Sequence, residues 1–170
     1  MLLNNYWNLV EYTSKAIPNQ NQYEGKDLGM VDPTGTAFTT LVGPSSVNTA
    51  TNWSSRYGIS LRIGTGTTTP QASDHNLTTD ITNSMFNVQQ TLNSIYSDGQ
   101  LKTVMTISGT NNTGSTITIT EIGVLKSVYK FVPPSSYSAT SALLSHDLLN
   151  TPLTVPSGNG FNIVYEWDQG

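Results

Sequence analysis

Apolar and polar residues alternate with a period of two along much of this chain. In residues 59–63, Ile59, Leu61 and Ile63 share one face and their polar neighbours share the other. The same alternation runs through residues 100–109 and residues 161–167. A period of two is typical of strands with one buried face. The pattern therefore predicts that the body of the chain consists of short β-strands.

Other segments are enriched in β-branched and aromatic residues and are also predicted as strands, at residues 37–42, 85–97, 116–125 and 152–155. We expect an irregularity within residues 85–97, because their apolar spacing is uneven. Turn signals rich in Asn, Asp and Gly separate the strands. One of them, Asn111-Asn112-Thr113-Gly114, predicts that residues 100–109 and 116–125 form an antiparallel hairpin.

The N-terminal segment has a different pattern. Residues 1–16 carry apolar side chains at spacings of three and four, which predicts a short helix that ends before Pro18. Residues 17–36 are rich in Asn, Gln, Gly and Pro, which predicts an extended linker or ordered loop. We therefore divide the chain into a helix and extended arm at residues 1–36 and a β-domain at residues 37–170.

These elements together predict an all-β fold. The expected architecture is an antiparallel β-sandwich with a short N-terminal helix and an extended arm. Jelly-roll and immunoglobulin-like topologies both remain open, because strand order cannot be read from one sequence.

Composition narrows the classes of function. Only 11% of residues are charged, against about 25% in an average soluble protein. The net charge is -4 and no basic tract occurs, which argues against nucleic-acid binding and against a membrane-surface role. A surface poor in charge loses little solvation energy when a partner covers it.

Cysteine is absent, so disulfides, thiolate nucleophiles and cysteine zinc sites are excluded. The first residues lack the basic and long apolar regions of a signal peptide, and no apolar run reaches the length of a membrane span. We therefore expect synthesis in the cytoplasm without a secretion signal.

The two histidines are the first candidates for catalysis. His75 follows Ser73-Asp74, and His146 lies between Ser145 and Asp147. A carboxylate that orients a histidine is part of many hydrolytic sites. Adjacent residues on a strand point to opposite faces, however, so neither triplet can pair internally unless it forms a tight turn. We expect no catalytic site, and we interpret His75 as a solvated loop residue.

Metal and phosphate sites are also not expected. The histidines lack the spacing of a zinc site. Asp74 and Asp80, with Asn76 and Asn83, offer oxygen atoms but lack the calcium-loop spacing. The glycine-rich segment at residues 64–67 lacks the lysine of a phosphate loop. We therefore expect no metal and no cofactor.

Aromatic residues suggest a function of another class. Trp53, Trp167 and Tyr129 could together form a sugar-stacking platform, as in carbohydrate-binding β-sandwich modules. For Trp167 the alternation with Phe161 and Ile163 favours a place in the core instead. The position of Trp53 is not decided by the pattern.

A set of motifs resembles a pattern in structural proteins of tailed bacteriophages. The set comprises LRIGTGTTTP at residues 61–70 with Ser73-Asp74 and Leu77 after it, ITEIGV at residues 119–124, and LLNTPLTV at residues 148–155. The resemblance covers residues 58–168. Proteins of this kind are virion parts, namely head decoration or cement proteins, head-fibre proteins and tail components.

The resemblance implies a non-enzymatic virion protein. The leading hypothesis is a capsid decoration or cement protein that binds the major capsid protein, or other virion proteins, and neighbouring copies of itself. The expected assembly is a symmetric homo-oligomer, with a trimer as the first expectation. A tail, neck or fibre-base protein is the alternative within the virion, and a carbohydrate-binding module is the alternative of another class.

The sequence also predicts the roles of particular residues, namely the apolar side chains of the N-terminal arm and Glu121. If the N-terminal arm docks on a neighbouring subunit, its apolar side chains make the contact, namely Leu3, Tyr6, Trp7, Leu9 and Val10. Glu121 lies on the same face as Ile119, so we expect it to point inward and to pair with Arg56 or Arg62.

Overall fold

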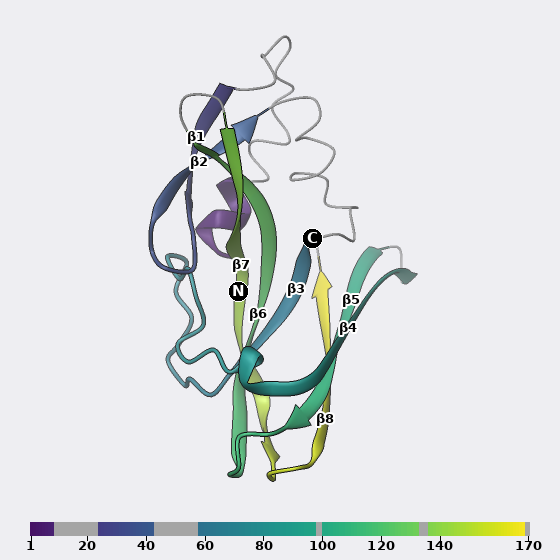
Figure 1. The fold of residues 1–170 in the computed structure, drawn as a ribbon. Coiled ribbons are helices and arrows are strands. Elements are labelled where there is room, and N and C mark those ends of the chain that lie inside the picture. The colour runs from purple at the N-terminus through teal and green to yellow at the C-terminus, as the bar shows by residue number, and fades with distance from the viewer. Residues whose placement is uncertain (9–23, 43–57, 98–99, 133–135, 169–170) are drawn as a thin grey trace. The chain divides into compact units, whose positions relative to one another are not determined.

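The computed structural model describes residues 1–8, 24–42, 58–97, 100–132 and 136–168 (Figure 1). The described chain is an all-β protein with one helical segment at residues 4–8 and a short 3-10 turn, η1 (Thr82–Ser84). Its strands are β1 (Glu24–Val31), β2 (Ala37–Val42), β3 (Ile59–Gly64), β4 (Met85–Ser97), β5 (Gln100–Asn111), β6 (Ile117–Val132), β7 (Ser136–Val155) and β8 (Gly160–Asp168).

The strands form two sheets. The larger sheet follows the order β1-β2-β6-β3, and β7 also pairs with β6. The smaller sheet has the order β4-β5-β8. The strand registers are antiparallel for β1–β2, β2–β6, β4–β5 and β5–β8. The predicted all-β, antiparallel class is therefore confirmed.

Several predicted strands match closely. The structure gives β2 and β4 the predicted limits, and β3 extends the prediction by one residue. The irregularity expected in β4 is a register shift between Phe86 and Gln89, where Asn87 has a positive φ of 50°. Residues 24–31, predicted only as an extended linker or loop, form β1.

The predicted hairpin between residues 100–109 and 116–125 is wrong. β5 pairs with β4 and β8, while β6 belongs to the other sheet. The turn between β5 and β6 is tied to the β7–β8 turn through Asn111, whose buried side-chain amide donates to Ser115 O and Val155 O, both at 2.8 Å. The turn therefore carries the chain away from β5 instead of folding β6 back onto it.

The described chain divides into two compact units. The first comprises Met1–Ser60, Thr68–Leu77 and Gly123–Asp147, and the second comprises Leu61–Thr67, Thr78–Ile122 and Leu148–Gly170. The boundary between an arm at residues 1–36 and a domain at residues 37–170 stays a prediction.

In the first unit, the N-terminal residues dock on β7. The backbone N–H of Leu3 donates to Leu144 O at 2.9 Å, and Leu2 forms an antiparallel bridge with Ser145. Leu3 is fully buried with Leu125 and Leu143. Backbone pairing and apolar burial together make this segment part of the unit's core.

The same docking is fixed by a buried asparagine. The Asn5 side chain donates to Val31 O at 2.9 Å and to Leu143 O at 3.2 Å. Its oxygen accepts from Val31 N at 2.9 Å. One amide side chain thus joins the helical segment to the end of β1 and to β7, and it satisfies backbone groups that would otherwise be buried without partners.

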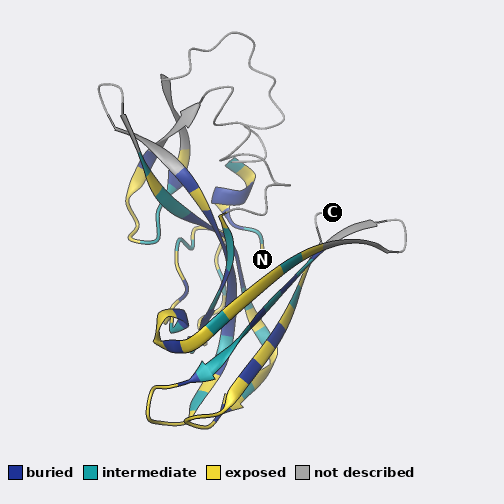
Figure 2. Ribbon diagram, turned by 45° about the vertical axis from the view of Figure 1, so that its right-hand side comes forward, coloured by how far each residue is buried: buried dark blue, intermediate teal, exposed yellow. Residues whose placement is uncertain are grey.

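In the second unit, one face of the smaller sheet is apolar. Met105 and Ile107 of β5 and Phe161 and Ile163 of β8 are buried, and their neighbours along each strand are half-buried or exposed (Figure 2). The period of two seen in the sequence therefore reports which side chains face the core. The predicted apolar face of the last strand is confirmed at these positions.

Candidate functional site: the Glu121 clamp

A carboxylate is buried in the second unit. Glu121 of β6 has a fully buried side chain. Its Oε1 accepts hydrogen bonds from Gly66 N at 2.9 Å and Thr79 N at 2.8 Å, and its Oε2 accepts from Thr78 N at 3.0 Å. Hydrogen bonds to an ionised group are among the stronger ones in proteins.

The two segments that Glu121 holds also pair with each other. Thr65 N donates to Thr79 O at 3.1 Å, and Gly64 forms an antiparallel bridge with Asp80. Thr120, the neighbour of Glu121, donates its hydroxyl to Gly66 O at 2.6 Å. We call Gly64, Gly66, Thr78, Thr79, Thr120 and Glu121 the Glu121 clamp.

Glycine is required at two positions of the clamp by close packing. A Cβ at Gly64 would overlap the Glu121 carboxylate and lie 2.6 Å from Thr79 O. A Cβ at Gly66 would lie 2.5 Å from the Thr78 Cβ and 2.6 Å from Glu121 Oε1. The glycines therefore allow the backbone to come within hydrogen-bonding distance of the carboxylate.

The substitution Gly64→Ala is expected to destabilise the protein by about 1–3 kcal/mol, the usual cost of overpacking a core. The added methyl group would push the carboxylate away from the amides that it binds. The matched control is Gly160→Ala, where a Cβ would lie an ordinary 3.6 Å from Gly109 O. Urea denaturation measures the difference in stability between the two variants. Equal denaturation midpoints would contradict the claim that close packing requires glycine at position 64.

The sequence predicted the burial of Glu121 but not its partners. The inward position is confirmed, and the observed partners are backbone amides. Of the two arginines expected to pair with it, Arg62 donates to Asn83 Oδ1 at 3.2 Å and lies 3.9 Å from Asp80 Oδ2. Arg56 lies outside the described residues. No local signal identifies the amide partners, because they come from segments 42 to 55 residues away.

A second, partly buried contact in the first unit joins residues from the two histidine triplets. His146 Nδ1 and Asp74 Oδ2 are hydrogen-bonded at 2.7 Å, and the same carboxylate oxygen accepts from Gln71 N at 2.9 Å. The His146 side chain is only 1% exposed. The pair therefore connects the loop around Asp74 to β7 within the unit. The sequence pattern did not predict this pair, because its two members lie 72 residues apart.

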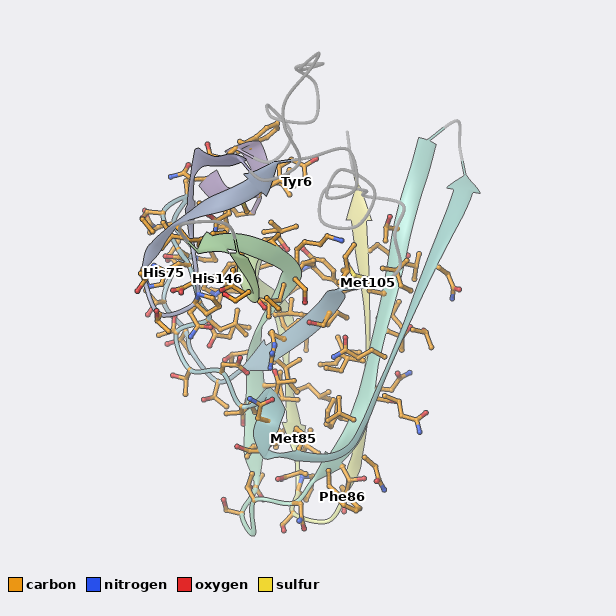
Figure 3. The ribbon with its side chains drawn as sticks, turned by 45° about the horizontal axis from the view of Figure 1, so that its top comes forward. Tyr6, His75, Met85, Phe86, Met105 and His146 are labelled. Atoms are coloured by element: carbon orange, nitrogen blue, oxygen red, sulfur yellow. The ribbon has the colours of Figure 1, made fainter. Side chains whose placement is uncertain are left out.

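His75, the other histidine, is half-buried beside the turn that precedes β2 (Figure 3). A Cβ at Gly35 would lie 3.1 Å from His75 Nε2. Residues 32–35 form a turn that is closed by a hydrogen bond of 2.9 Å from Gly35 N to Asp32 O. His75 is thus placed against a structured turn and not in open solvent as the sequence suggested.

Two further polar side chains of the first unit are buried. Lys126 of β6 is almost fully buried, and burial lowers the pKa of its ammonium group. Tyr6 of the helical segment is buried as well, and desolvation raises the pKa of its hydroxyl group. Both groups are enclosed by the fold, so we assign them no contact with a ligand.

The predicted partner-contact residues have different surroundings. Leu3 and Tyr6 are buried within their own chain, whereas Trp7 is 55% exposed. Leu9 and Val10 lie outside the described residues. That these residues contact a neighbouring subunit stays a prediction.

The other candidate sites can be placed only in part. Trp53 and the side chains of Trp167 and Tyr129, which would form the predicted sugar platform, lie outside what the structure describes. No cluster of three or more metal-binding side chains occurs among the described residues. In the same part of the chain, no helix is long and apolar enough to cross a membrane.

Comparison with known proteins gives no relative. No family model, no curated protein and no solved structure matches this chain. The function is therefore inferred from the residues of the chain, from their geometry and from the motif resemblance.

Proposed function

We propose that this chain is a non-enzymatic structural protein of a tailed-bacteriophage virion. Its proposed role is that of a capsid decoration or cement protein, which binds the shell and neighbouring copies. The observation that carries the proposal is that two of the phage-like motifs meet in the Glu121 clamp. Gly64 and Gly66 belong to the first motif, and Thr120 and Glu121 belong to the second.

The clamp supports a structural role for these motifs. Both oxygens of the Glu121 carboxylate accept backbone hydrogen bonds, and the side chain has no exposed surface. A catalytic carboxylate must reach a substrate. A sequence pattern whose central residue stabilises backbone segments suits a scaffold that acts by association.

The outer face of the smaller sheet is suited to burial against a partner. Its side chains are neutral at most described positions, including Thr91 and Asn93 of β4, Thr106 of β5, and Asn162 and Val164 of β8. Neutral groups cost less to desolvate than charged ones. Such a face can therefore be covered by another protein at a modest cost in solvation energy.

We further propose that the strands form a β-sandwich of the jelly-roll or immunoglobulin-like type. Contacts within the second unit support this arrangement. The Gln90 side chain of β4 accepts from Leu61 N of β3 at 2.7 Å and donates to Leu61 O at 3.0 Å. These bonds link a strand of the smaller sheet to a strand of the larger one.

The test is binding of the purified full-length protein to undecorated phage capsids, read by co-sedimentation and electron microscopy. We expect stoichiometric binding, and Trp7→Ala is expected to weaken it by at least about tenfold, because exposed tryptophans often dominate interfaces. The control is Phe86→Ala, since Phe86 is 56% exposed, much like Trp7. A truncation is unsuitable, because removing residues 1–36 also removes the buried Leu3 and β1.

The outcomes separate the hypotheses. Binding that is lost on Trp7→Ala but kept on Phe86→Ala supports the decoration role and the arm contact together. Binding to purified tails but not to heads moves the function to the tail, neck or fibre base. Failure to bind any virion part, together with a change of tryptophan fluorescence on addition of a polysaccharide, would favour the carbohydrate-binding alternative.

A further inference from the structure

The outer strand β4 of the smaller sheet has an open edge. β4 pairs with β5 along one side, from Met85 opposite Asn111 to Ser97 opposite Gln100. On its other side, the described part of the chain supplies no paired strand. An open edge presents backbone N–H and C=O groups that can pair with another chain.

This edge lacks most of the features that keep edge strands apart. Proteins usually protect an edge with charged residues, with proline or with a bulge. β4 is 13 residues long and contains no charged residue, no proline and no glycine. Its one irregularity, at residues 86–89, lies near its start and leaves the stretch from Gln89 to Ser97 in regular register.

The other edges in the described chain are protected. β8, the opposite edge of the same sheet, carries Glu166 and Asp168. β1 carries three charged residues, Glu24, Lys26 and Asp27. β3 is only six residues long, carries Arg62, and has the backbone of Leu61 occupied by the Gln90 amide. β7, which pairs with β6 beside this path, carries Asp147 and Pro152, and its Ser145 forms a bridge with Leu2. Among the described strands, β4 alone thus has a long edge without these protections.

We propose that β4 pairs antiparallel with β4 of a second copy, across a two-fold axis near Thr91, and joins two three-stranded sheets into one. The inference rests on the proposed function, which requires copies to associate, and adds the surface by which they do so. A two-fold contact of this kind is self-complementary and links copies in pairs. It therefore favours a dimer, or an assembly built of dimers, over the trimer expected from the sequence.

Side chains on the outer face favour a second copy as the partner. With the axis at Thr91, each Thr91 lies opposite its counterpart, and Gln89 lies opposite Asn93 of the other copy. All three side chains are exposed and neutral. Threonine pairs are favourable across strands, and like charges are unfavourable. Pairing at the β8 edge would instead place the charged side chains of Glu166 and Asp168 beside a second strand, at a greater cost in solvation energy.

Cysteine cross-linking tests the geometry directly, because the chain has no cysteine of its own. Opposed Cβ atoms on antiparallel strands lie about 4.5–5.5 Å apart, close to disulfide distance. Thr91→Cys is expected to give a disulfide-linked dimer on mild oxidation, and Asn162→Cys on β8 is expected to stay unlinked. Cross-linking of Asn162→Cys alone, or of neither variant, would overturn the proposal.

A charge exchange provides an independent test in sedimentation velocity. Thr91→Lys and Thr91→Glu should each be monomeric where the unmodified protein is dimeric, and an equal mixture should restore the dimer. Asn162→Lys, the control, should leave the dimer unchanged. Two monomeric single variants that fail to recombine, or a dimer that neither variant disturbs, would overturn the proposal.

This inference and the proposed function can fail separately. A protein that is monomeric at every concentration, yet binds capsids in stoichiometric amounts, would overturn the β4 contact and leave the decoration role standing. A β4-linked dimer that binds no virion part would confirm the contact and contradict the decoration role.

Discussion

Replacing Glu121 with alanine is expected to lower the free energy of unfolding by about 4 kcal/mol. The change removes an acceptor shared by three backbone amides, those of Gly66, Thr78 and Thr79. A buried donor left without a partner, such as the Gly66 amide, costs about 1–3 kcal/mol. The partly buried amides of Thr78 and Thr79 add to this cost. The loss of the side chain also leaves a cavity beside two glycines, which adds to the cost.

The substitution Glu121→Gln removes the negative charge of the side chain and keeps its volume, so it measures the contribution of the charge and of the lost acceptor alone. Glutamine fills nearly the same space, but its NH₂ group would face an amide that needs an acceptor. We expect a loss of about 2 kcal/mol or more, since at least one amide then lacks its partner. Urea denaturation, followed by tryptophan fluorescence, measures both variants.

The control for both variants is Glu166→Ala. Glu166 lies on β8 and is exposed, so its removal should change the free energy of unfolding by no more than about 0.5 kcal/mol. If Glu121→Ala were no more costly than Glu166→Ala, the clamp would not stabilise the fold. The interpretation that the phage-like motifs stabilise the fold would then be wrong.

Replacing Leu3 with alanine is expected to cost about 2–5 kcal/mol, the range for truncating a buried leucine. Leu3 is fully buried with Leu125 and Leu143, and its backbone N–H is bonded to β7. A terminal residue usually contributes little to stability unless its segment is docked. The size of the loss therefore reports whether the N-terminal residues belong to the core of their own unit.

Leu148→Ala is the matched control, because it makes the same substitution at a leucine that is 38% exposed. We expect it to cost clearly less, about 1 kcal/mol. Thermal unfolding monitored by circular dichroism compares the two variants with the unmodified chain. If Leu3→Ala left the unfolding temperature unchanged but weakened capsid binding, the N-terminal segment would act as a free arm and not as part of the unit.

Local pattern was sufficient to predict most of the strands. β2 and β4 have the predicted limits, because their β-branched and aromatic residues are bounded by strong turn signals. The alternation in β5 and β8 identified the buried face correctly. β1 was missed because its segment, EGKDLGMV, is charged and contains two glycines, and its pairing with β2 overrides that weak local preference.

The local sequence pattern does not predict which strands pair with each other, or which distant side chains come into contact. The hairpin prediction failed because alternation shows which face of β5 is buried but not which strand lies beside it. The pairing of His146 with Asp74 spans 72 residues, and Glu121 accepts from backbone amides, which the pattern of side chains does not mark. Contacts of this kind depend on the three-dimensional path of the chain, which the sequence pattern does not specify.

The central claim, that the protein is a structural part of a virion, is tested most directly by cryo-electron microscopy of purified phage particles that encode it, combined with quantitative mass spectrometry. The account predicts many copies per particle at symmetric positions on the outside of the head, with the β-strands visible in the density. Absence of the chain from purified particles would contradict the claim.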